Sequence, residues 1–398
     1  MGLYKKGYLF ISNGRVLPRE QELSLEPVKT SSFEAPAMYA ADQLGLKLYM
    51  GVNRDYAEQL KGVDYNISFY NQHIYRNIFG IKDIIIGYKN LCNFLESHQD
   101  IGVIHCNTPI GGVLGRICGK KYNKKVIYTA HGFHFFKGAP LVNRTIFKWI
   151  EEWMAHYSDA IITINKEDYE AAQKLHLKPG GKAYYIPGVG VDLNAYDGVV
   201  VDKTLKFNEI GLPDNAKVGI VVGDLNDNKN VSTLIKAIPN TPKSFHIIIC
   251  GIGPNEDSLK KLTEKLNVAE RVHFLGFRKD VKELYAISDI FLFASKREGL
   301  PRSTMEAMCM QLPCIVSRIR GNIDLIDEGH GGYLIAPTDI EGYAEAINKV
   351  LSDKVLANSL GKYNRDKVEL FSLDVVKTEM VKVFNKVICG SNDSIQIG

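Results

Sequence analysis

Two glutamates with seven residues between them lie in a segment that could hold a polyol phosphate. Glu298 follows the apolar run 290–295, which is typical of a buried parallel strand. After the bend at Gly299, Pro301 suits the first turn of a helix. A helix start presents free N–H groups and a positive dipole end, which together bind phosphate. The amides would take the phosphate, and Glu298 and Glu306 would take hydroxyls, although an ordinary loop with two surface acids fits these residues equally well.

A lysine could supply a positive charge from a second loop. The segment 223–230 closes the apolar run 218–222, and Asn226 or Asp227 could turn the chain there. Lys229 could then reach a phosphate as a point charge. A single lysine in a polar turn is more often simply solvated, so Lys229 alone decides little.

Two further loops follow predicted strands in the second half. The turn at Gly251 carries a lone Gly-x-Gly, and Glu256 stands where the dinucleotide-binding pattern Gly-x-Gly-x-x-Gly needs its third glycine. Gly251 is therefore interpreted as part of a close-packed loop. Phe277 and Arg278 follow the next predicted strand. Phe277 could face a ligand there, or it could equally belong to the core.

In the first half, the candidate residues are a histidine and several glycines. His131 follows the predicted strand 125–129 and precedes a glycine, so it is well placed to face a cleft. A structural histidine is the common alternative, and the spacing alone does not decide between the two. Gly111 belongs to a loop with two glycines, which indicates either close backbone approach to a ligand or a tight turn.

These residues need α/β domains to position them. Short apolar runs alternate with helical patterns in both halves, which predicts right-handed βαβ units and parallel sheets. The alternation lapses around 188–216, in a turn-rich stretch. We therefore expect domains at 1–188 and 189–372, with a last helix at about 373–390 packing back on the first.

Length and composition agree with two cytosolic domains. At 398 residues the chain exceeds one ordinary domain, and no stretch approaches the ~20 apolar residues that cross a bilayer. The seven cysteines form no CxxC pair and no metal-ligand spacing, which favours a reducing compartment. The N-terminal residues lack a secretory signal pattern.

The positive charge is concentrated in the first half. Residues 1–190 hold 23 Lys and Arg against 17 Asp and Glu, a net charge of +6, while the remainder carries −2. Such a cluster is usually a solvated face, but it could hold the protein near an anionic membrane. Nucleic-acid binding is not expected, because the basic cluster around 116–125 has a single aromatic residue and no reader motif.

The paired glutamates followed by Ala307-Met308 resemble the signature of retaining glycosyltransferases of family 4, which have the GT-B fold of two Rossmann-like domains facing a cleft. The loop at Gly223 and Lys229 resembles the family's diphosphate-binding loop, but Asp224 stands where arginine is usual and Asn230 where glycine is usual. The segment 129–138 resembles the family's histidine loop, which implies His131 as its histidine and His134 as a weaker candidate. By this match, His131 would donate a hydrogen bond to developing negative charge. The likeness is nearest to bacterial enzymes that build capsule or exopolysaccharide.

The resemblance implies roles for these residues. Glu306 would bind ribose hydroxyls, Glu298 sugar hydroxyls, and Lys229 with His131 the donor phosphates, which makes Glu298, His131 and Lys229 the catalytic candidates. The donor-binding set is Gly223, Lys229, Gly251, Phe277, Arg278, Glu298, Gly299, Leu300, Pro301 and Glu306. The acceptor-side set is Asn13, Gly14, Arg15 and Gly111, although the loop at Asn13 departs from the family's double glycine.

The expected activity is transfer of a hexose from a nucleoside diphosphate sugar, with UDP as the expected nucleotide, to a glycan or lipid-linked sugar, with retention. The sequence has no Asp-x-Asp motif, so neither a metal nor another cofactor is expected. The expected location is the cytoplasm, with peripheral contact at the inner face of the membrane. Two alternatives stay open: a sugar-nucleotide epimerase of GT-B fold, and a degenerate partner subunit, for which Asp224 is the best support.

Overall fold

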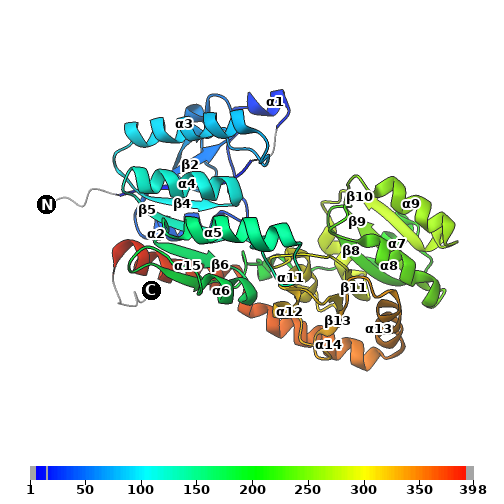
Figure 1. Ribbon diagram of the computed structural model, residues 1–398. Helices are drawn as coiled ribbons and strands as arrows, with labels where there is room; N and C mark the ends of the chain where they lie inside the picture. Colours follow the sequence, from blue (N-terminus) through cyan, green and yellow to red (C-terminus); the bar gives the residue numbers. More distant parts are fainter. Residues whose placement is uncertain (1–5, 15–16, 391–398) are drawn as a thin grey trace. The chain divides into compact units, whose positions relative to one another are not determined.

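The computed structural model describes residues 6–14 and 17–390, which divide into two compact units. Unit 1 comprises Met1–Gly190 and Asp374–Gly398, and unit 2 comprises Val191–Leu373 (Figure 1). The change from one unit to the next falls two residues after the predicted boundary at 188. Each unit is built on a single parallel sheet.

Unit 1 contains a seven-stranded parallel sheet in the order β3-β2-β1-β4-β5-β6-β7. Its strands are β1 (Gly7–Ile11), β2 (Lys47–Val52), β3 (Ile67–Asn71), β4 (Ile101–Asn107), β5 (Lys125–Ala130), β6 (Ala160–Thr163) and β7 (Lys182–Tyr185). The strand order reverses between β1 and β4, and ligands of such sheets bind outside the carboxyl ends of the strands at this switch point.

Helices cover both faces of this sheet. The helices of unit 1 are α1 (Arg19–Glu22), α2 (Ala35–Gln43), α3 (Ile81–Ser97), α4 (Pro109–Lys121), α5 (Lys148–Ala155), α6 (Lys166–Ala172) and, from Asp374 on, α15 (Leu373–Phe384). Successive residues of β1 point to opposite faces, as a strand's period of two requires. Tyr8 and Phe10 pack with α2 and α15, whereas Leu9 and Ile11 pack with α3 and α4.

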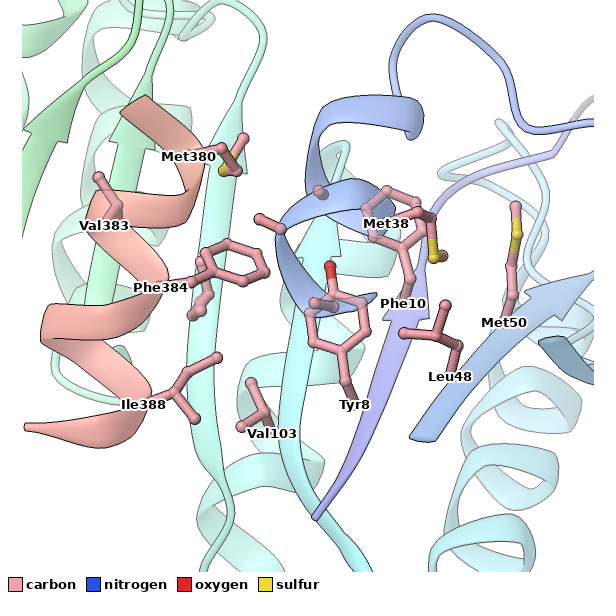
Figure 2. Close-up of a cluster of buried hydrophobic side chains, with 14 of the residues drawn as sticks. Tyr8, Phe10, Met38, Leu48, Met50, Val103, Met380, Val383, Phe384 and Ile388 are labelled. Atoms are coloured by element: carbon pink, nitrogen blue, oxygen red, sulfur yellow. The ribbon is translucent and has the colours of Figure 1, made fainter. Parts of the chain in front are cut away.

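The last helix completes unit 1. In Figure 2, Tyr8 lies between Phe384 of α15 and Met38 of α2, so residues from both ends of the chain share one core. The rings of Tyr8 and Phe384 are 5.6 Å apart. Burial of Phe384, Met380 and Val383 explains why an amphipathic helix with no strand after it is held to this sheet.

Unit 2 contains a six-stranded parallel sheet in the order β10-β9-β8-β11-β12-β13, with its switch point between β8 and β11. The strands are β8 (Lys217–Val222), β9 (Phe245–Cys250), β10 (Val272–Gly276), β11 (Ile290–Phe293), β12 (Cys314–Ser317) and β13 (Gly332–Ile335). The helices are α7 (Lys203–Ile210), α8 (Val231–Ala237), α9 (Glu256–Lys265), α10 (Val281–Ala286), α11 (Arg302–Cys309), α12 (Asn322–Leu325), α13 (Ile340–Ser352) and α14 (Lys354–Val368).

The predicted class, two α/β halves with parallel sheets, is confirmed. The structure corrects two expectations about helix starts. Pro301 is the N-cap of α11 rather than its first helical residue. Gly111, predicted in a loop, lies in the first turn of α4, which begins at Pro109 because a proline fits the first turn of a helix. In the described part of the chain, no helix is both long enough and apolar enough to span a bilayer.

Candidate active site

The structure brings Lys229 and Glu298 together at the switch point of unit 2. Lys229 lies in the loop after β8 and Glu298 in the loop after β11, the two strands between which the order reverses. The lysine Nζ lies 2.8 Å from the glutamate Oε1, and the side chains are only 21% and 17% exposed. A cation and a carboxylate, both largely shielded from water, therefore face one another where an open α/β sheet binds its ligand.

Asparagines shape the loop that presents Lys229. The Oδ1 of Asn226 accepts hydrogen bonds from the backbone N–H groups of Asn228 and Lys229, both at 3.0 Å. Asn230 has φ +52°, a left-handed conformation that favours glycine but that asparagine tolerates best among other residues. Its Nδ2 also donates to the carbonyl of Ala294, 3.1 Å away, which ties this loop to the end of β11. Asn230, which stands where glycine is usual in the family, thus has a left-handed backbone conformation that glycine favours.

The glycines beside Lys229 allow close approach of two loops. The lysine side chain lies along Gly223, at whose position a β-carbon would be 3.2 Å from Lys229 Cε. Gly251, after β9, packs directly on this turn, because a β-carbon there would overlap the carbonyl oxygen of Gly223. Its role as a close-packing glycine follows from that contact.

A third loop supports Glu298 and the start of α11. Arg320 Nε donates to the carbonyl oxygen of Glu298 at 3.0 Å. Gly321 has φ +80° and packs on the carbonyl of Gly299, where a side chain would collide. Pro301 caps α11 without a side-chain hydrogen bond, so the first amides of this helix are available to an anion. Leu300 is buried beneath the loop.

Glu306 lies in α11 among hydrogen-bond donors. Its Oε1 is 2.9 Å from Arg302 Nε, and Tyr285 donates to its Oε2 at 3.4 Å. Burial raises the pKa of Tyr196, which Glu306 raises further through its negative charge, and burial raises the pKa of Tyr285. Both phenols therefore keep their protons at neutral pH and fix the carboxylate, whose side chain is 15% exposed.

The loop after β10 exposes an aromatic ring. Phe277 is 72% exposed, so it does not belong to the core. Arg278 is held by two carboxylates: it lies 2.6 Å from Asp280 and 2.5 Å from Glu209 of α7, and it keeps the pKa of Asp280 well below its usual range. Phe277 therefore projects freely, while Arg278 ties the β10 loop to α7. Asp224 is exposed to solvent.

In unit 1, His131 follows β5 and is held by two neighbours. Its Nε2 lies 3.2 Å from Asn107 Nδ2, and the ring of Phe33 meets it edge-on at 5.2 Å. Burial lowers the pKa of His131 to about 4, so the imidazole is neutral at pH 7. With the amide of Asn107 donating to Nε2, the ring proton lies on Nδ1, which is buried and has no protein partner in the described residues. His131 is thus a neutral imidazole whose Nδ1–H is buried and unsatisfied by the described residues, and the residue lines a pocket of unit 1.

Two of the predicted acceptor-side residues meet at the switch point of unit 1. Asn13, after β1, accepts a hydrogen bond at 2.6 Å from the N–H of Gly111 in the first turn of α4. Asn13 N–H in turn donates to Thr108 Oγ1 at 2.8 Å. Gly14 lies beside them in a bridge with Tyr75, and Arg15 lies outside the described residues.

A pocket of about 400 Å³ opens at this end of unit 1. Its lining includes Asn13, Gly14 and His131, together with residues that the sequence analysis did not single out. These further residues include Lys29, Phe33, Glu34, Asn53, Arg54, Gln72, Arg76 and Asn107. The sequence offers one signal for these pocket residues, which is that polar residues directly follow β2 and β3. The carboxyl ends of parallel strands meet at one edge of a sheet, so such residues lie close together. Within residues 6–14 and 17–390, no three His, Cys, Asp or Glu side chains gather as a metal site.

Comparison with known proteins shows the family. The model of the family Glycosyl transferases group 1 matches residues 202–367. The model of the family Glycosyltransferase Family 4 matches residues 56–194. The chain is 31% identical over 361 residues to EpsD of Bacillus subtilis (strain 168), and the match covers 89% of this chain and 93% of that protein. The chain belongs to glycosyltransferase family 4. This membership confirms two predictions, the family and the enzyme class, which is glycosyltransferase.

A second relative and two solved structures agree. The Escherichia coli UDP-Gal:alpha-D-GlcNAc-diphosphoundecaprenol alpha-1,3-galactosyltransferase is 32% identical over 312 residues, 76% of this chain and 79% of that protein. Anabaena Alr3699/HepE in complex with UDP and glucose has a TM-score of 0.75 at 18% identity, covering 96% of this chain and 100% of that one. Sucrose-phosphate synthase from Thermosynechococcus elongatus has a TM-score of 0.78 at 18% identity, covering 97% and 100%. These likenesses confirm the GT-B fold.

Proposed function

We propose that this family 4 enzyme transfers a hexose from a UDP-sugar to a lipid-linked sugar acceptor, with retention at the anomeric carbon and without a metal. The observation that carries the proposal is the Lys229–Glu298 pair beside the uncapped start of α11. The pair and the helix start together match the two needs of a nucleotide sugar, which are charge for its phosphates and acceptors for its hydroxyls.

The donor would bind in unit 2, each part against a separate group. When the donor binds, Lys229 pairs with the diphosphate instead of with Glu298. The freed Glu298 carboxylate then accepts hydrogen bonds from sugar hydroxyls. Glu306 accepts from the ribose hydroxyls, since its geometry is already fixed by Tyr285 and Arg302. The exposed ring of Phe277 offers a surface for the base. UDP as the nucleotide is supported by the Escherichia coli relative, which is named for its use of UDP-Gal.

Retention would follow from attack on the face from which UDP leaves. The bond from the anomeric carbon to the phosphate oxygen breaks, the acceptor oxygen bonds to that carbon, and the acceptor proton passes to the leaving phosphate. Negative charge builds up on the diphosphate, and Lys229 with the α11 amides stabilises it. These donors carry the charge that a metal would otherwise neutralise.

The acceptor would bind in the unit 1 pocket. Among its described lining residues, Lys29, Arg54 and Arg76 are cationic and Glu34 is the carboxylate. An excess of cations suits an acceptor that carries phosphate, and Arg76 and Arg54 can each contact phosphate in a bidentate manner. The acceptor in the name of the Escherichia coli relative is a sugar joined to diphosphoundecaprenol. Such an acceptor resides in a membrane, so we place the enzyme at the membrane's cytoplasmic face.

The direct test is a panel of UDP-sugars with a lipid-linked sugar acceptor, analysed by NMR for the anomeric configuration of the product. We expect one UDP-sugar to give an α-linked product from an α-linked donor, with an unchanged rate after a chelator is added. Inversion would exclude the retaining mechanism, and loss of rate with the chelator would exclude metal independence. Formation of an epimerised sugar nucleotide without acceptor would instead indicate an epimerase.

A further inference from the structure

Unit 1 exposes an unusual concentration of large apolar side chains in two segments, 78–86 and 141–153. Phe79 is 85% exposed, Trp149 63% and Trp153 50%. The other exposed members are Ile78, Ile81, Ile85, Ile86, Leu141, Val142 and Ile146. We call these ten residues the apolar face. Contiguous apolar surface of this kind marks a place where a protein meets another body.

The helical stretch that leads into α5 and includes it turns its apolar side towards solvent. Val142, Ile146, Trp149 and Trp153 recur at helical spacing along one side, whereas the buried residues of α5 are Met154 and Ala155. The rings of Trp149 and Trp153 stack with centroids 6.1 Å apart. A helix that packed only on the sheet would bury this stripe, so the stripe must serve something outside unit 1.

The two segments form one surface. Helices α3, α4 and α5 lie side by side over the same face of the sheet (Figure 1). Between them is a hollow of about 190 Å³. Its lining includes Ile78 and Ile84 from the first segment, Val113 and Leu114 from α4, and Phe147 and Ile150 from the second segment. The hollow therefore joins the two segments across α4.

Positive charges border this surface, and its carboxylates are paired. Lys82 and Arg144 are exposed within the two segments, and Lys120, at the end of α4, lies 4.3 Å from the ring of Tyr157, which contacts Trp153. The acids in the segments each have a partner. Asp83 pairs with His73, Glu151 with Arg116, and Glu152 with Lys148.

We propose that the apolar face docks on an anionic lipid bilayer, with Trp149 and Trp153 at the level of the headgroups. Tryptophan favours that level because its ring is apolar and its N–H is polar, and lysines extend their amines from it to lipid phosphates. A second copy of the chain is a poorer occupant, because the same cations would then face each other. The inference deepens the proposed function and rests on its membrane location.

The position of the apolar face suits a lipid-linked acceptor. Asn107 and Thr108 line the acceptor pocket, and the next two residues, Pro109 and Ile110, line the apolar hollow. Consecutive residues thus line the pocket for the polar headgroup and the surface that would rest on the lipid. A protein docked by this face would receive the headgroup of its acceptor from the same bilayer.

The experiment uses the fact that the sequence contains two tryptophans, both on the apolar face. Their fluorescence is recorded while vesicles of phosphatidylethanolamine and phosphatidylglycerol are added, without sugar nucleotide. We expect a blue shift that high salt weakens, and a smaller shift with phosphatidylcholine vesicles. An unchanged spectrum would overturn the proposal. So would a blue shift that depends on protein concentration in the absence of vesicles, which would identify a second copy as the occupant.

Variants that keep both tryptophans provide the matched comparison. The double change Phe79→Ser and Ile146→Ser removes exposed apolar groups, so we expect it to raise the lipid concentration for half-maximal shift by about tenfold or more. The control Val355→Ser, at an 81% exposed position in unit 2, should change it less than about twofold. Transfer to a soluble acceptor analogue should be the same in all three proteins, which separates failed docking from failed catalysis. Equal vesicle binding by all three would contradict the proposal.

Discussion

At the scale of single residues, the candidate site depends on a cation and a carboxylate that satisfy each other until a ligand arrives. Lys229 and Glu298 are both largely buried, and an unpaired charge in such a place is costly. Their ion pair keeps the empty site stable, and a diphosphate with sugar hydroxyls can replace it group for group. The pair therefore explains how one site can be stable without ligand and complementary to a charged donor.

Replacing Lys229 with alanine should lower kcat/KM for the donor by about 10²–10³-fold, since it removes one of the groups that stabilise the leaving diphosphate. Steady-state rates at varied UDP-sugar would measure the loss. Lys236→Ala, an exposed lysine of α8 in the same unit, serves as the control and should keep full activity. A Lys229 variant within a few-fold of the wild type would show that the diphosphate is held elsewhere.

Glu306→Gln should act on binding more than on chemistry. A carboxylate that accepts ribose hydroxyls holds the substrate and the transition state equally, so we expect the KM for the donor to rise about tenfold with little change in kcat. Separate determination of kcat and KM decides the matter. The opposite pattern, a large fall in kcat at unchanged KM, would place Glu306 at the reacting sugar instead.

The pH response of His131 follows from its low pKa. Burial lowers this pKa from 6.5 to about 4, so the folded protein binds fewer protons than the unfolded chain between these values. Stability should therefore fall as pH drops from 6.5 towards 4 and should be level above 6.5. Melting temperatures across this range should decline less steeply for His131→Gln. A wild-type activity inflection near pH 6.5 that the variant loses would contradict a neutral His131.

At the scale of elements, the site depends on loops that approach each other through glycine. Gly251→Ala would push the β9 loop away from Gly223, whose carbonyl occupies the space for a β-carbon. We expect a loss of about 1–3 kcal/mol of stability and weaker binding of UDP. Gly102→Ala is the control, because its β-carbon would meet only ordinary contacts with Lys6. Equal melting temperatures for the two variants would show that the β9 loop can shift without cost.

The elements themselves could largely be predicted from the sequence, because buried parallel strands are continuous apolar runs that turn-forming residues interrupt. The runs at 290–293 and 218–222 illustrate this, since both are strands of the sheet. The helix starts were less certain, because Pro301 can serve as either N-cap or first residue. The conformation of Asn230 was also hidden, since its type alone does not reveal a left-handed backbone.

The candidate site was predicted less completely than the fold. Lys229 and Glu298 are 69 residues apart in the chain, and periodicity alone cannot pair side chains at that separation. Arg302, which contacts Glu306, lies between the paired glutamates, but the pattern gives it no role of its own. Tyr196, which is close to Glu306, comes from the start of unit 2 and lies in no recognisable motif. In unit 1, Arg54 and Arg76 become candidates only when the strand order brings their loops to one pocket.

At the scale of the whole molecule, two units with separate cores divide the work. Unit 2 holds the candidate donor site, and unit 1 holds the pocket at His131 and the apolar face. The chain closes unit 1 with its last helix, so truncation before Asp374 would open a core that contains Tyr8 and Phe384. Each site can therefore be tested in the intact chain by a variant in its own unit.

The central claim is that Glu298 holds the sugar of a UDP-sugar beside Lys229. The most direct measurement compares the wild type with Glu298→Gln for two quantities, the affinity for UDP by calorimetry and the rate of sugar transfer. We predict that UDP binds within a few-fold of the wild type while transfer falls by about 10²-fold or more, since the carboxylate contacts the sugar and not the nucleotide. Transfer at the wild-type rate by Glu298→Gln would contradict the account.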